Sequence, residues 1–480
     1  MYQSRGLTQS GRLSTIKTGF CFILSFSCLV FLLYGVLFEN GVVGPDAELS
    51  RLEAEIRGAK DILTQEKNAF DVYENISFEL TELRKQLLDV APQDSNSFEP
   101  SLEMKLKLSF KPSSSHLFDG KTVILLICYN RPNYLKRTLD SVIENLPRSS
   151  KENTDTITFV ISQDGKNPAV NDIAQEYVKS LSQKGFNTMH LTHPRLEKDI
   201  RGVKKQMQGY YKLADHFKWV LNKVFDELHA KRVVILEDDM KISNDFFEFM
   251  GATSVLLDVD ETLMAVSAWN DNGQIGHAWD SERIIRTDFF AGLGWMMNTR
   301  IWEELSGIWP EAFWDDWLRN PKQRKGRKFL SPEISRTYNF GSKGGASKGQ
   351  FFQKYIGSMK ENEVPVKFSM LDMSYLLESK YDKAWKAEVL ASDLVNLDRI
   401  LADTTFMDGK TCRIEYRSDK HFIDIAKRLS LIPEWKDDTP RQGYYGVVKI
   451  RFHGGTLFIV PKPSLNTWKK LMSINTTKNA

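Results

Sequence analysis

The sequence predicts an α/β fold with a mostly parallel sheet, followed by a smaller α+β domain. Apolar runs of strand length alternate with segments of helical periodicity between residues 123 and 240, which is typical of repeated βα units. The uninterrupted apolar run Val233–Leu236 indicates a strand buried on both faces. Beyond about Lys383 the pattern changes to mixed helices and strands, which indicates a second domain.

The elements of the sheet follow one another in a regular order. Pro132 is suited to open a helix, because proline is favoured in the first helical turn. The expected strands are Val123–Cys128, Thr156–Gln163, Met189–Thr192, Arg232–Leu236 and Val266–Trp269, and the expected helices begin at Pro132 and cover about Ile173–Leu181 and Gly209–Phe225. Tyr444–Phe452 and Gly455–Val460 are expected to form a hairpin in the second domain.

Three acids, Glu237, Asp238 and Asp239, follow the buried strand directly. The carboxyl ends of strands in an open α/β sheet face the crevice where ligands bind, so these carboxylates are expected there. Crowded carboxylates favour a hard cation such as Mg2+ or Mn2+, which they commonly share with substrate phosphates. The alternative is that the acids cap the next helix or lie in a solvated loop.

Asp164 ends the second strand and Arg131 follows the first, so both are expected at the same edge of the sheet as the acids. The Arg131 guanidinium suits phosphate, and the Asp164 carboxylate suits a base or a ribose. The alternatives are a surface ion pair for Arg131 and a turn before Gly165 for Asp164. His216 lies near the apolar face of its helix, where packing with one hydrogen bond is the default interpretation.

Asp315 and Asp316 lie among aromatic residues in the segment Phe313–Trp317. Aromatic neighbours can exclude water and raise the proton affinity of a carboxylate, which suits a general base. The alternative is an N-cap for a helix beginning at Trp317. The glycines between Gly341 and Gly349 indicate a polar loop able to close over a diphosphate, although the spacing is not that of a P-loop.

The N-terminal region predicts a membrane anchor. Residues 19–38 are twenty uncharged, largely apolar residues, enough helix to cross a bilayer. Positive residues precede this segment and acidic residues follow it, so residues 1–18 are expected in the cytosol and the rest in the lumen. Sequons at Asn75 and Asn475 agree with a secretory address. Only Cys128 and Cys412 lie beyond the span, so the soluble part can form one disulfide at most.

The remaining parts are assigned by composition. The predicted divisions are a stem and linker at 39–118, a catalytic domain at 119–355, a connector at 356–382, the smaller domain at 383–465 and a tail at 466–480. The basic segment Pro321–Lys328 is expected to be a solvated loop.

Composition and motifs disfavour several classes of function. Lys and Arg total 65 against 62 acids, and this balance gives no support for a nucleic-acid partner. The sequence also lacks Gly-x-Ser-x-Gly, His-Glu-x-x-His and zinc-spaced Cys/His motifs, which disfavours hydrolases and zinc enzymes.

Long ordered motifs resemble the N-acetylglucosaminyltransferase I family from about Val123 to Pro463. The stretches that carry the resemblance are Ser162–Asp164, Gln208–Lys212, Glu237–Asp239, Ser267–Gly273, Arg286–Phe290, Gly292–Trp295, Trp309–Trp317 and Pro332–Thr337. The resemblance implies a GT-A fold and Mn2+-dependent, inverting transfer of GlcNAc from UDP-GlcNAc to the 2-hydroxyl of the α-1,3-linked mannose of N-glycans. It also implies high-mannose glycoprotein acceptors and a Golgi membrane.

The resemblance assigns roles residue by residue. Asp239 corresponds to the metal ligand and Asp315 to the catalytic base. The positions that correspond to donor contacts are Arg131, Asp164, His216, Asp238 and Ser347. The match around Ser347 needs one extra residue, and Gly165 and Val266 stand where two family cysteines are expected.

Two alternatives to this function remain. A related enzyme forms the same β-1,2 linkage on protein O-mannose, but it typically carries a carbohydrate-binding stem domain, for which Ala47–Ser115 is too short and too helical. A luminal binding protein without activity is the second alternative, and it would have no need for a base such as Asp315.

Overall fold

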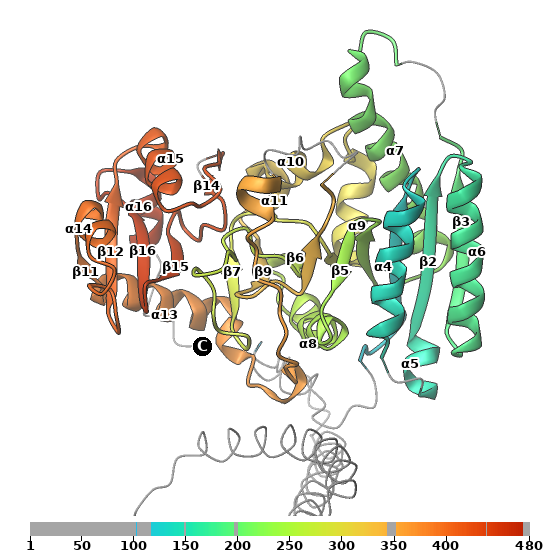
Figure 1. The fold of residues 1–480 in the computed structure, drawn as a ribbon, viewed down its shortest axis with the longest axis horizontal. Helices are drawn as coiled ribbons and strands as arrows, with labels where there is room; N and C mark the ends of the chain where they lie inside the picture. The colour runs from blue at the N-terminus through green and yellow to red at the C-terminus, as the bar shows by residue number, and fades with distance from the viewer. Residues whose placement is uncertain are drawn as a thin grey trace, which may run out of the picture. The chain divides into compact units, whose positions relative to one another are not determined.

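A mixed sheet of eight strands organises the catalytic part of the chain (Figure 1). The computed structural model describes residues 102, 117–147, 150–195, 200–342, 352–437 and 439–473. In spatial order the strands are β3 (Asn187–His193), β2 (Ile157–Asp164), β1 (Thr122–Cys128), β4 (Arg232–Glu237), β8 (Trp295–Asn298), β6 (Leu263–Ser267), β9 (Lys328–Pro332) and β7 (Ile284–Thr287).

Most of these strands run in one direction. The pairs β3·β2, β2·β1, β1·β4 and β6·β9 are parallel. Strand β8 is antiparallel to both β4 and β6, so β4 and β6 share a direction, and only β8 and the edge strand β7 run the other way. The predicted α/β fold with a mostly parallel sheet is therefore confirmed, and the carboxyl ends of β1, β2 and β4 face the same edge.

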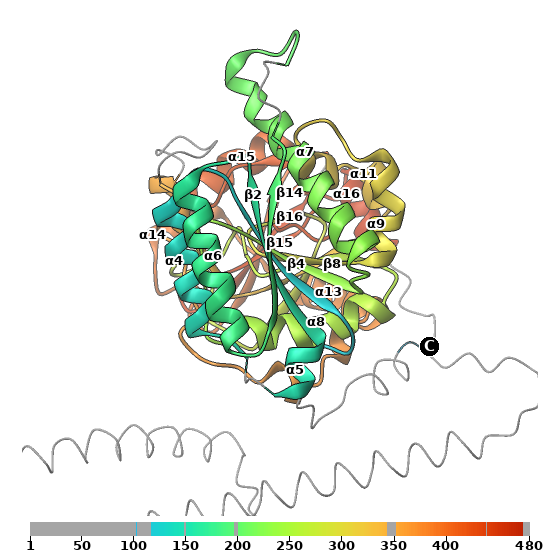
Figure 2. The same ribbon diagram turned by 90° about the vertical axis from the view of Figure 1, so that its right-hand side faces the viewer.

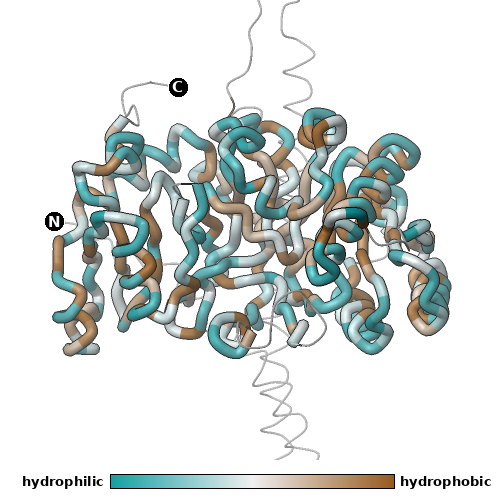
Figure 3. Tube along the Cα trace, turned by 90° about the horizontal axis from the view of Figure 1, so that it is seen from above, coloured by the Kyte–Doolittle hydropathy of each residue, from teal (hydrophilic) through white to brown (hydrophobic). Residues whose placement is uncertain are grey.

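Helices cover both faces of the sheet (Figure 2). On one face, α4 (Pro132–Glu144) and α6 (Pro168–Gln183) pack on β1 and β2 through Leu135, Leu139 and Ala174. On the other, α7 (Gln208–Asn222) and α9 (Thr299–Leu305) pack on β1 and β4 through Phe217 and Trp302. Apolar and polar segments are interspersed along the described chain (Figure 3).

Local sequence explains the two elements that lead to the predicted site. Every residue of β1 is buried, as expected for a strand covered on both faces. Helix α4 begins at Pro132, whose fixed φ suits the first helical turn. The remaining elements of the larger sheet region are α5 (Lys151–Thr156), the π-helix η2 (Lys223–Glu227), β5 (Met240–Ile242), α8 (Phe246–Val259), α10 (Trp314–Arg319), α11 (Pro321–Arg324) and β10 (Thr337–Asn339).

A second sheet lies in the C-terminal part of the chain and has its own core. Its order is β11 (Asp393–Leu394), β12 (Thr411–Tyr416), β16 (Gly455–Pro461) and β15 (Val448–Phe452), accompanied by α13 (Glu378–Ala391), α14 (Leu397–Ala402), α15 (Asp419–Arg428) and α16 (Asn466–Met472). β15 and β16 form the predicted hairpin. The described residues belong to one compact unit, and the predicted domain boundaries stay predictions.

The expectation for the basic segment Pro321–Lys328 is wrong. Its first residues form α11, Lys328 begins β9, and Arg324, Arg327 and Lys328 are buried. Arg327 pairs with Glu304, while Arg324 and Lys328 pair with Asp288. Buried cations need acidic partners, which Glu304 and Asp288 supply from other parts of the sequence. Cations in a solvated loop would not need such partners.

Asp288 joins the larger sheet region to the C-terminal part. Its carboxylate accepts hydrogen bonds from Arg324 Nη1 at 3.1 Å, Lys328 Nζ at 2.5 Å and the Tyr445 backbone N–H at 2.6 Å. Burial opposes ionisation of Asp288, but Lys328 and Arg324 outweigh it and lower its pKa below 3.8. The charged carboxylate therefore stabilises the fold above pH 3.8, and this contribution is lost as the pH falls through the lowered pKa.

Asp288→Asn should lower the free energy of unfolding by about 3–5 kcal/mol near pH 7, because it leaves two buried cations without their counter-charge. Below pH 3.8 the difference from wild type should shrink, because the unfolded wild-type chain then binds a proton at Asp288 that the folded protein takes up only at the lowered pKa. Chemical denaturation at several pH values measures this difference. A penalty that does not change with pH would contradict the assigned role of the charge.

Several predictions concern residues outside the described part of the chain. They are the cytosolic tail, the membrane span at 19–38, nearly all of the stem, Ser347 and the sequons at Asn75 and Asn475. Among the described residues, no helix combines the length and apolar character needed to span a bilayer. Cys128 and Cys412 are both buried and unpaired.

Candidate functional site

The acid triplet lies at the carboxyl end of β4, as the sequence predicts. β4 ends at Glu237 and β5 begins at Met240, so Asp238 and Asp239 occupy the turn between them. Arg131, which immediately precedes α4 at the end of β1, forms ion pairs with Asp238 and with Asp239, the latter at 2.9 Å. The structure thus brings together one guanidinium and two carboxylates that were predicted to meet.

The electrostatics of the triplet reflect crowding. Desolvation raises the pKa of Glu237 to about 8, and the charges of Asp239 and Asp238 add to this effect. Desolvation also raises the pKa of Asp238 to about 6, although Arg131 opposes it. One guanidinium therefore faces three acids, and the excess negative potential favours an added cation.

Asp239 is contacted by the last residue of β10 and by the residue that follows the strand. Asn339 Nδ2 donates to Asp239 Oδ1 at 3.2 Å, and the Phe340 N–H donates to the Asp239 carbonyl oxygen at 2.9 Å. A Cβ atom on Gly341 would lie only 2.3 Å from Asp239 Oδ2. Gly341 therefore gives the carboxylate the space it needs.

The residues present fit a hard divalent cation. Carboxylate oxygens are its preferred ligands, and Mg2+ or Mn2+ typically takes one or two carboxylates plus substrate phosphates. Within the described ranges, no group of three or more His, Cys, Asp and Glu side chains is arranged to hold a metal. A cation at Asp239 would thus share its coordination with a ligand.

Gly341→Ala should weaken divalent-cation binding at Asp239 at least tenfold, because the new methyl group must displace the Asp239 carboxylate. Gly307→Ala is a matched control, since a Cβ atom there would meet nothing within 4 Å. Isothermal titration with Mn2+ measures both. Equal affinities in the two variants would show that the Gly341 contact does not position Asp239.

Asp164 lies at the end of β2 within a second polar group. His193 Nδ1 donates to Asp164 Oδ1 at 2.8 Å, and Arg195 forms an ion pair with Asp164 Oδ2. His216 on α7 is fully buried, and its Nε2 lies 2.7 Å from Ser162 Oγ on the same strand as Asp164. Burial, together with the charges of His193 and Arg195, lowers the pKa of His216 to about 3, so its ring is neutral near pH 7.

Asp315 lies in the first turn of α10, which begins at Trp314. The prediction that the acids cap a helix beginning at Trp317 is therefore wrong. Phe313 precedes the helix in the left-handed conformation, with φ of 53°. The Trp314 ring stacks on Phe217 at 4.3 Å and on Trp295 at 5.6 Å between centroids. This packing anchors the first turn of α10 and leaves Asp315 partly exposed.

Asp315 and Asp316 have different surroundings. Arg319 Nη1 lies 3.2 Å from Asp315 and 2.7 Å from Asp316, and Lys436 lies 2.9 Å from Asp316 alone. Partial burial opposes ionisation of Asp316, but Lys436 and Arg319 outweigh it and lower its pKa. Asp316 is thus held by two cations, whereas Asp315 contacts only Arg319 among the cations of the described residues.

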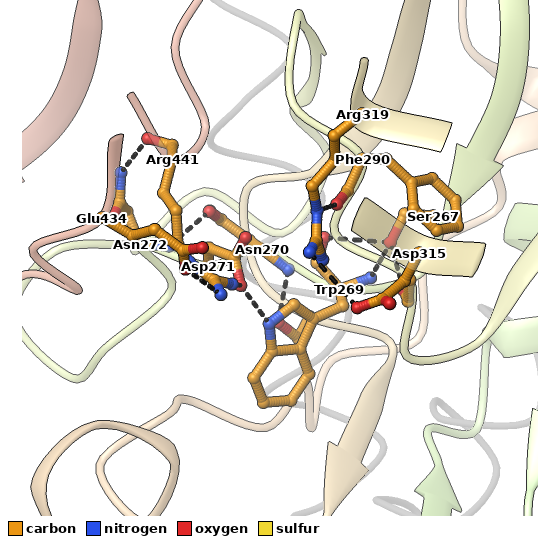
Figure 4. A network of polar contacts seen from close by, with 12 residues as sticks. Ser267, Trp269, Asn270, Asp271, Asn272, Phe290, Asp315, Arg319, Glu434 and Arg441 are labelled. Atoms are coloured by element: carbon orange, nitrogen blue, oxygen red, sulfur yellow. Dashed lines mark hydrogen bonds and ion pairs between the residues drawn. The ribbon is translucent and has the colours of Figure 1, made fainter. Parts of the chain in front are cut away.

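Arg319 connects Asp315 to the wall of the site (Figure 4). Its Nε donates to the Phe290 carbonyl oxygen at 2.9 Å while Nη1 contacts Asp315. Among the influences on the Glu237 pKa, the charge of Asp315 also raises it, after the larger effects of burial, Asp239, Asp238 and Arg131. Arg131, Asp238 and Asp239 are in direct contact, whereas Asp315 contacts Arg319.

The motif Ser267–Gly273 builds the side of the site next to the C-terminal part (Figure 4). Ser267 Oγ donates to the Gly292 carbonyl oxygen at 2.7 Å. Trp269 is buried, and its Nε1 donates to Asp271 at 3.1 Å. Arg441 Nη1 also contacts Asp271, at 2.8 Å. The motif thus has a structural role that its composition did not reveal.

Sequence reasoning missed several residues of these polar groups. Arg319 follows Asp315 by four residues and would have been found from helical spacing if α10 had been predicted to begin at Trp314. The partners Asn339, His193 and Lys436 come from other elements, so no local signal indicated them. Ser347 lies outside the described residues.

Comparisons with known proteins identify the family of the chain. The GNT-I family model matches residues 75–472. The chain belongs to the GNT-I family. This finding confirms the family predicted from the ordered motifs.

One curated relative of this GNT-I family chain is the alpha-1,3-mannosyl-glycoprotein 2-beta-N-acetylglucosaminyltransferase of Arabidopsis thaliana. The two are 41% identical over 331 residues, which covers 68% of this chain and 71% of that protein. Among solved structures, a mannosyltransferase from Pyrobaculum calidifontis in complex with GDP-Man and Mn2+ matches with a TM-score of 0.26 and 11% identity. That match covers 60% of this chain and 70% of the other.

Proposed function

We propose that this GNT-I family glycosyltransferase moves GlcNAc from UDP-GlcNAc to the 2-hydroxyl of the α-1,3-linked mannose of N-glycans, with inversion at the anomeric carbon. Membership of the family and the name of the 41% identical relative support the reaction. The observation that carries it to residues is the ion pairing of Arg131 with Asp238 and Asp239 at the carboxyl end of β4.

Inversion in a single displacement needs an acceptor oxygen that attacks the sugar opposite the departing UDP. Asp315 is partly exposed and has Arg319 as its cation contact, so its carboxylate is available to accept the proton of the mannose hydroxyl. Arg319 contacts both the Phe290 carbonyl oxygen and Asp315. This double contact limits rotation of the Asp315 side chain. Asp315 is therefore the proposed general base.

The other carboxylates bind the donor. Asp239 is the proposed ligand of Mn2+, and this cation supplies neutralisation of the charge that develops on the departing diphosphate. Arg131 adds a positive charge beside the same carboxylates. Asp164, His216, Asp238 and Ser347 are the proposed further donor contacts, and Ser347 rests on the family resemblance alone.

Product formation tests the proposed reaction. Purified luminal protein is given UDP-GlcNAc and Mn2+ with either a high-mannose N-glycan or an O-mannosyl peptide, and UDP release and the product linkage are measured. Transfer to the N-glycan with a new β-1,2 linkage is expected. Transfer to the O-mannosyl peptide alone would replace this function with the related one, and binding without UDP release would indicate an inactive binding protein.

The proposed address is the Golgi membrane, with a single type II span at residues 19–38 and a luminal catalytic part. The uncharged segment and the positive residues before it support this orientation. Protease treatment of intact Golgi vesicles should leave the catalytic part protected until detergent is added. Digestion of the catalytic part without detergent would reverse the orientation.

A further inference from the structure

His193 occupies a central position in the polar group around Asp164. It is the last residue of β3 and pairs in register with Asp164 on β2. Its side chain is buried, and its Nδ1 lies 2.8 Å from Asp164 Oδ1. An ionised carboxylate only accepts hydrogen bonds, so Nδ1 carries the proton and donates it to Asp164.

The same imidazole contacts α7 with its other side. Its ring stacks on His216 with centroids 4.9 Å apart and planes 15° apart, and it lies 5.1 Å from the Trp219 ring. Its Nε2 faces Asp215 Oδ2 at 3.4 Å. One ring thus links Asp164 on β2 to His216 on α7, both of which are proposed donor contacts.

The charges around His193 are Asp164 and Asp215 on either side, with Arg195 paired to Asp164. The Arg195 guanidinium also lies 3.8 Å above the Tyr129 ring, which fixes the far side of the Asp164 carboxylate. Burial lowers the pKa of His193, and Asp215 opposes this. The hydrogen bond from Nδ1 to Asp164 holds that carboxylate in place whether or not Nε2 is also protonated.

His216 has one buried ring nitrogen whose hydrogen-bonding capacity is not used within the described residues. Its Nε2 contacts Ser162, whereas its buried Nδ1 has no hydrogen-bond partner among the described residues. A buried polar atom without a partner is costly, and a bound ligand removes that cost. The stacking of His193 restricts the direction in which this nitrogen points.

We propose that His193 is a positioning residue for the nucleoside part of the donor, because it fixes the Asp164 carboxylate and the His216 ring relative to each other. The inference rests on the proposed function, in which Asp164 and His216 contact the donor. His193 itself does not need to touch the nucleotide. Its loss should therefore affect donor binding and leave the chemical step nearly intact.

His193→Ala should raise the donor KM and the Kd for UDP with Mn2+ on the order of tenfold, since it removes a hydrogen bond to a charged group and a stacked ring. The kcat and the acceptor KM should stay within about twofold. His193→Gln keeps one N–H donor but no ring, so its donor KM should fall between wild type and His193→Ala. A purely structural role would instead lower the active fraction and kcat without this separation.

His190→Gln is the matched control. His190 lies on the same strand, but its Nδ1 contacts Gln175 at 3.0 Å instead of Asp164. Its donor KM should equal that of wild type. If His193→Ala fails to fold, the comparison of His193→Gln with His190→Gln still decides the question.

The possible failures are distinguishable. An unchanged donor KM in a folded His193 variant, with normal turnover by wild type, would overturn the positioning role alone. An equal rise of donor KM in the His190 and His193 variants would also overturn it. Absence of UDP-GlcNAc turnover in wild type would instead refute the proposed function.

Discussion

Asp315→Asn should lower the rate of GlcNAc transfer by roughly 10²–10⁴-fold, the contribution expected of a positioned general base. Asparagine keeps the shape of the side chain and can still contact Arg319, but it cannot take the proton of the acceptor hydroxyl. The affinity for UDP with Mn2+ should remain close to wild type. Steady-state kinetics together with calorimetric binding of UDP measure the two quantities separately.

Asp316→Asn is the matched control for Asp315→Asn. Asp316 is adjacent in sequence and shares Arg319, but it is also paired with Lys436. Its substitution should cost mainly stability, with a loss of rate below about tenfold. Turnover of Asp315→Asn comparable to wild type, or a larger loss in Asp316→Asn, would remove Asp315 from the role of base.

Asp239→Ala should abolish the dependence of UDP affinity on metal. With Mn2+ present, the affinity for UDP should fall by at least about 100-fold. Changing a residue that only hydrogen-bonds a metal ligand costs up to about this much, and Asp239 is the proposed ligand itself. Truncation to alanine removes both carboxylate oxygens of Asp239. Titration calorimetry with UDP and Mn2+ provides the measurement.

Wild-type protein treated with a chelator supplies the reference for Asp239→Ala. The variant with Mn2+ should bind UDP as weakly as the wild type without metal. Binding that still increases on addition of Mn2+ would show that another residue holds the cation.

Local sequence was sufficient to predict those elements whose apolar pattern or proline position determines the structure. Every residue of β1 and most of β4 are buried between layers, and Pro132 begins α4, so these elements and the acids that follow β4 were predictable. The carboxyl ends of parallel strands meet at one edge, which is why Arg131 could be expected beside Asp238 and Asp239.

Long-range partners determined what could not be predicted. The antiparallel insertion of β8 between β4 and β6 depends on pairing between segments distant in sequence. The basic segment after Pro321 looked like a solvated loop because its partner Asp288 belongs to another element. α10 was expected to begin later because the packing of Trp314 on Phe217 and Trp295 has no signature within the segment itself.

The family resemblance supplied the roles that physical reasoning alone ranked lower. His216 is fully buried, and a histidine near an apolar helix face is most simply explained by packing. The structure adds a stacked partner, His193, and an Nδ1 atom without a hydrogen-bond partner among the described residues. These observations give a physical reason to test His216 as a donor contact.

Asp239 and Asp315 are proposed to act on the same sugar nucleotide. A crystal structure of the protein with UDP-GlcNAc and Mn2+ tests this proposal most directly. We expect one donor molecule whose diphosphate shares the cation with Asp239 and whose anomeric carbon faces the Asp315 carboxylate. A donor bound through Asp239 with its sugar directed away from Asp315, or bound without contact to Asp239, would contradict the claim.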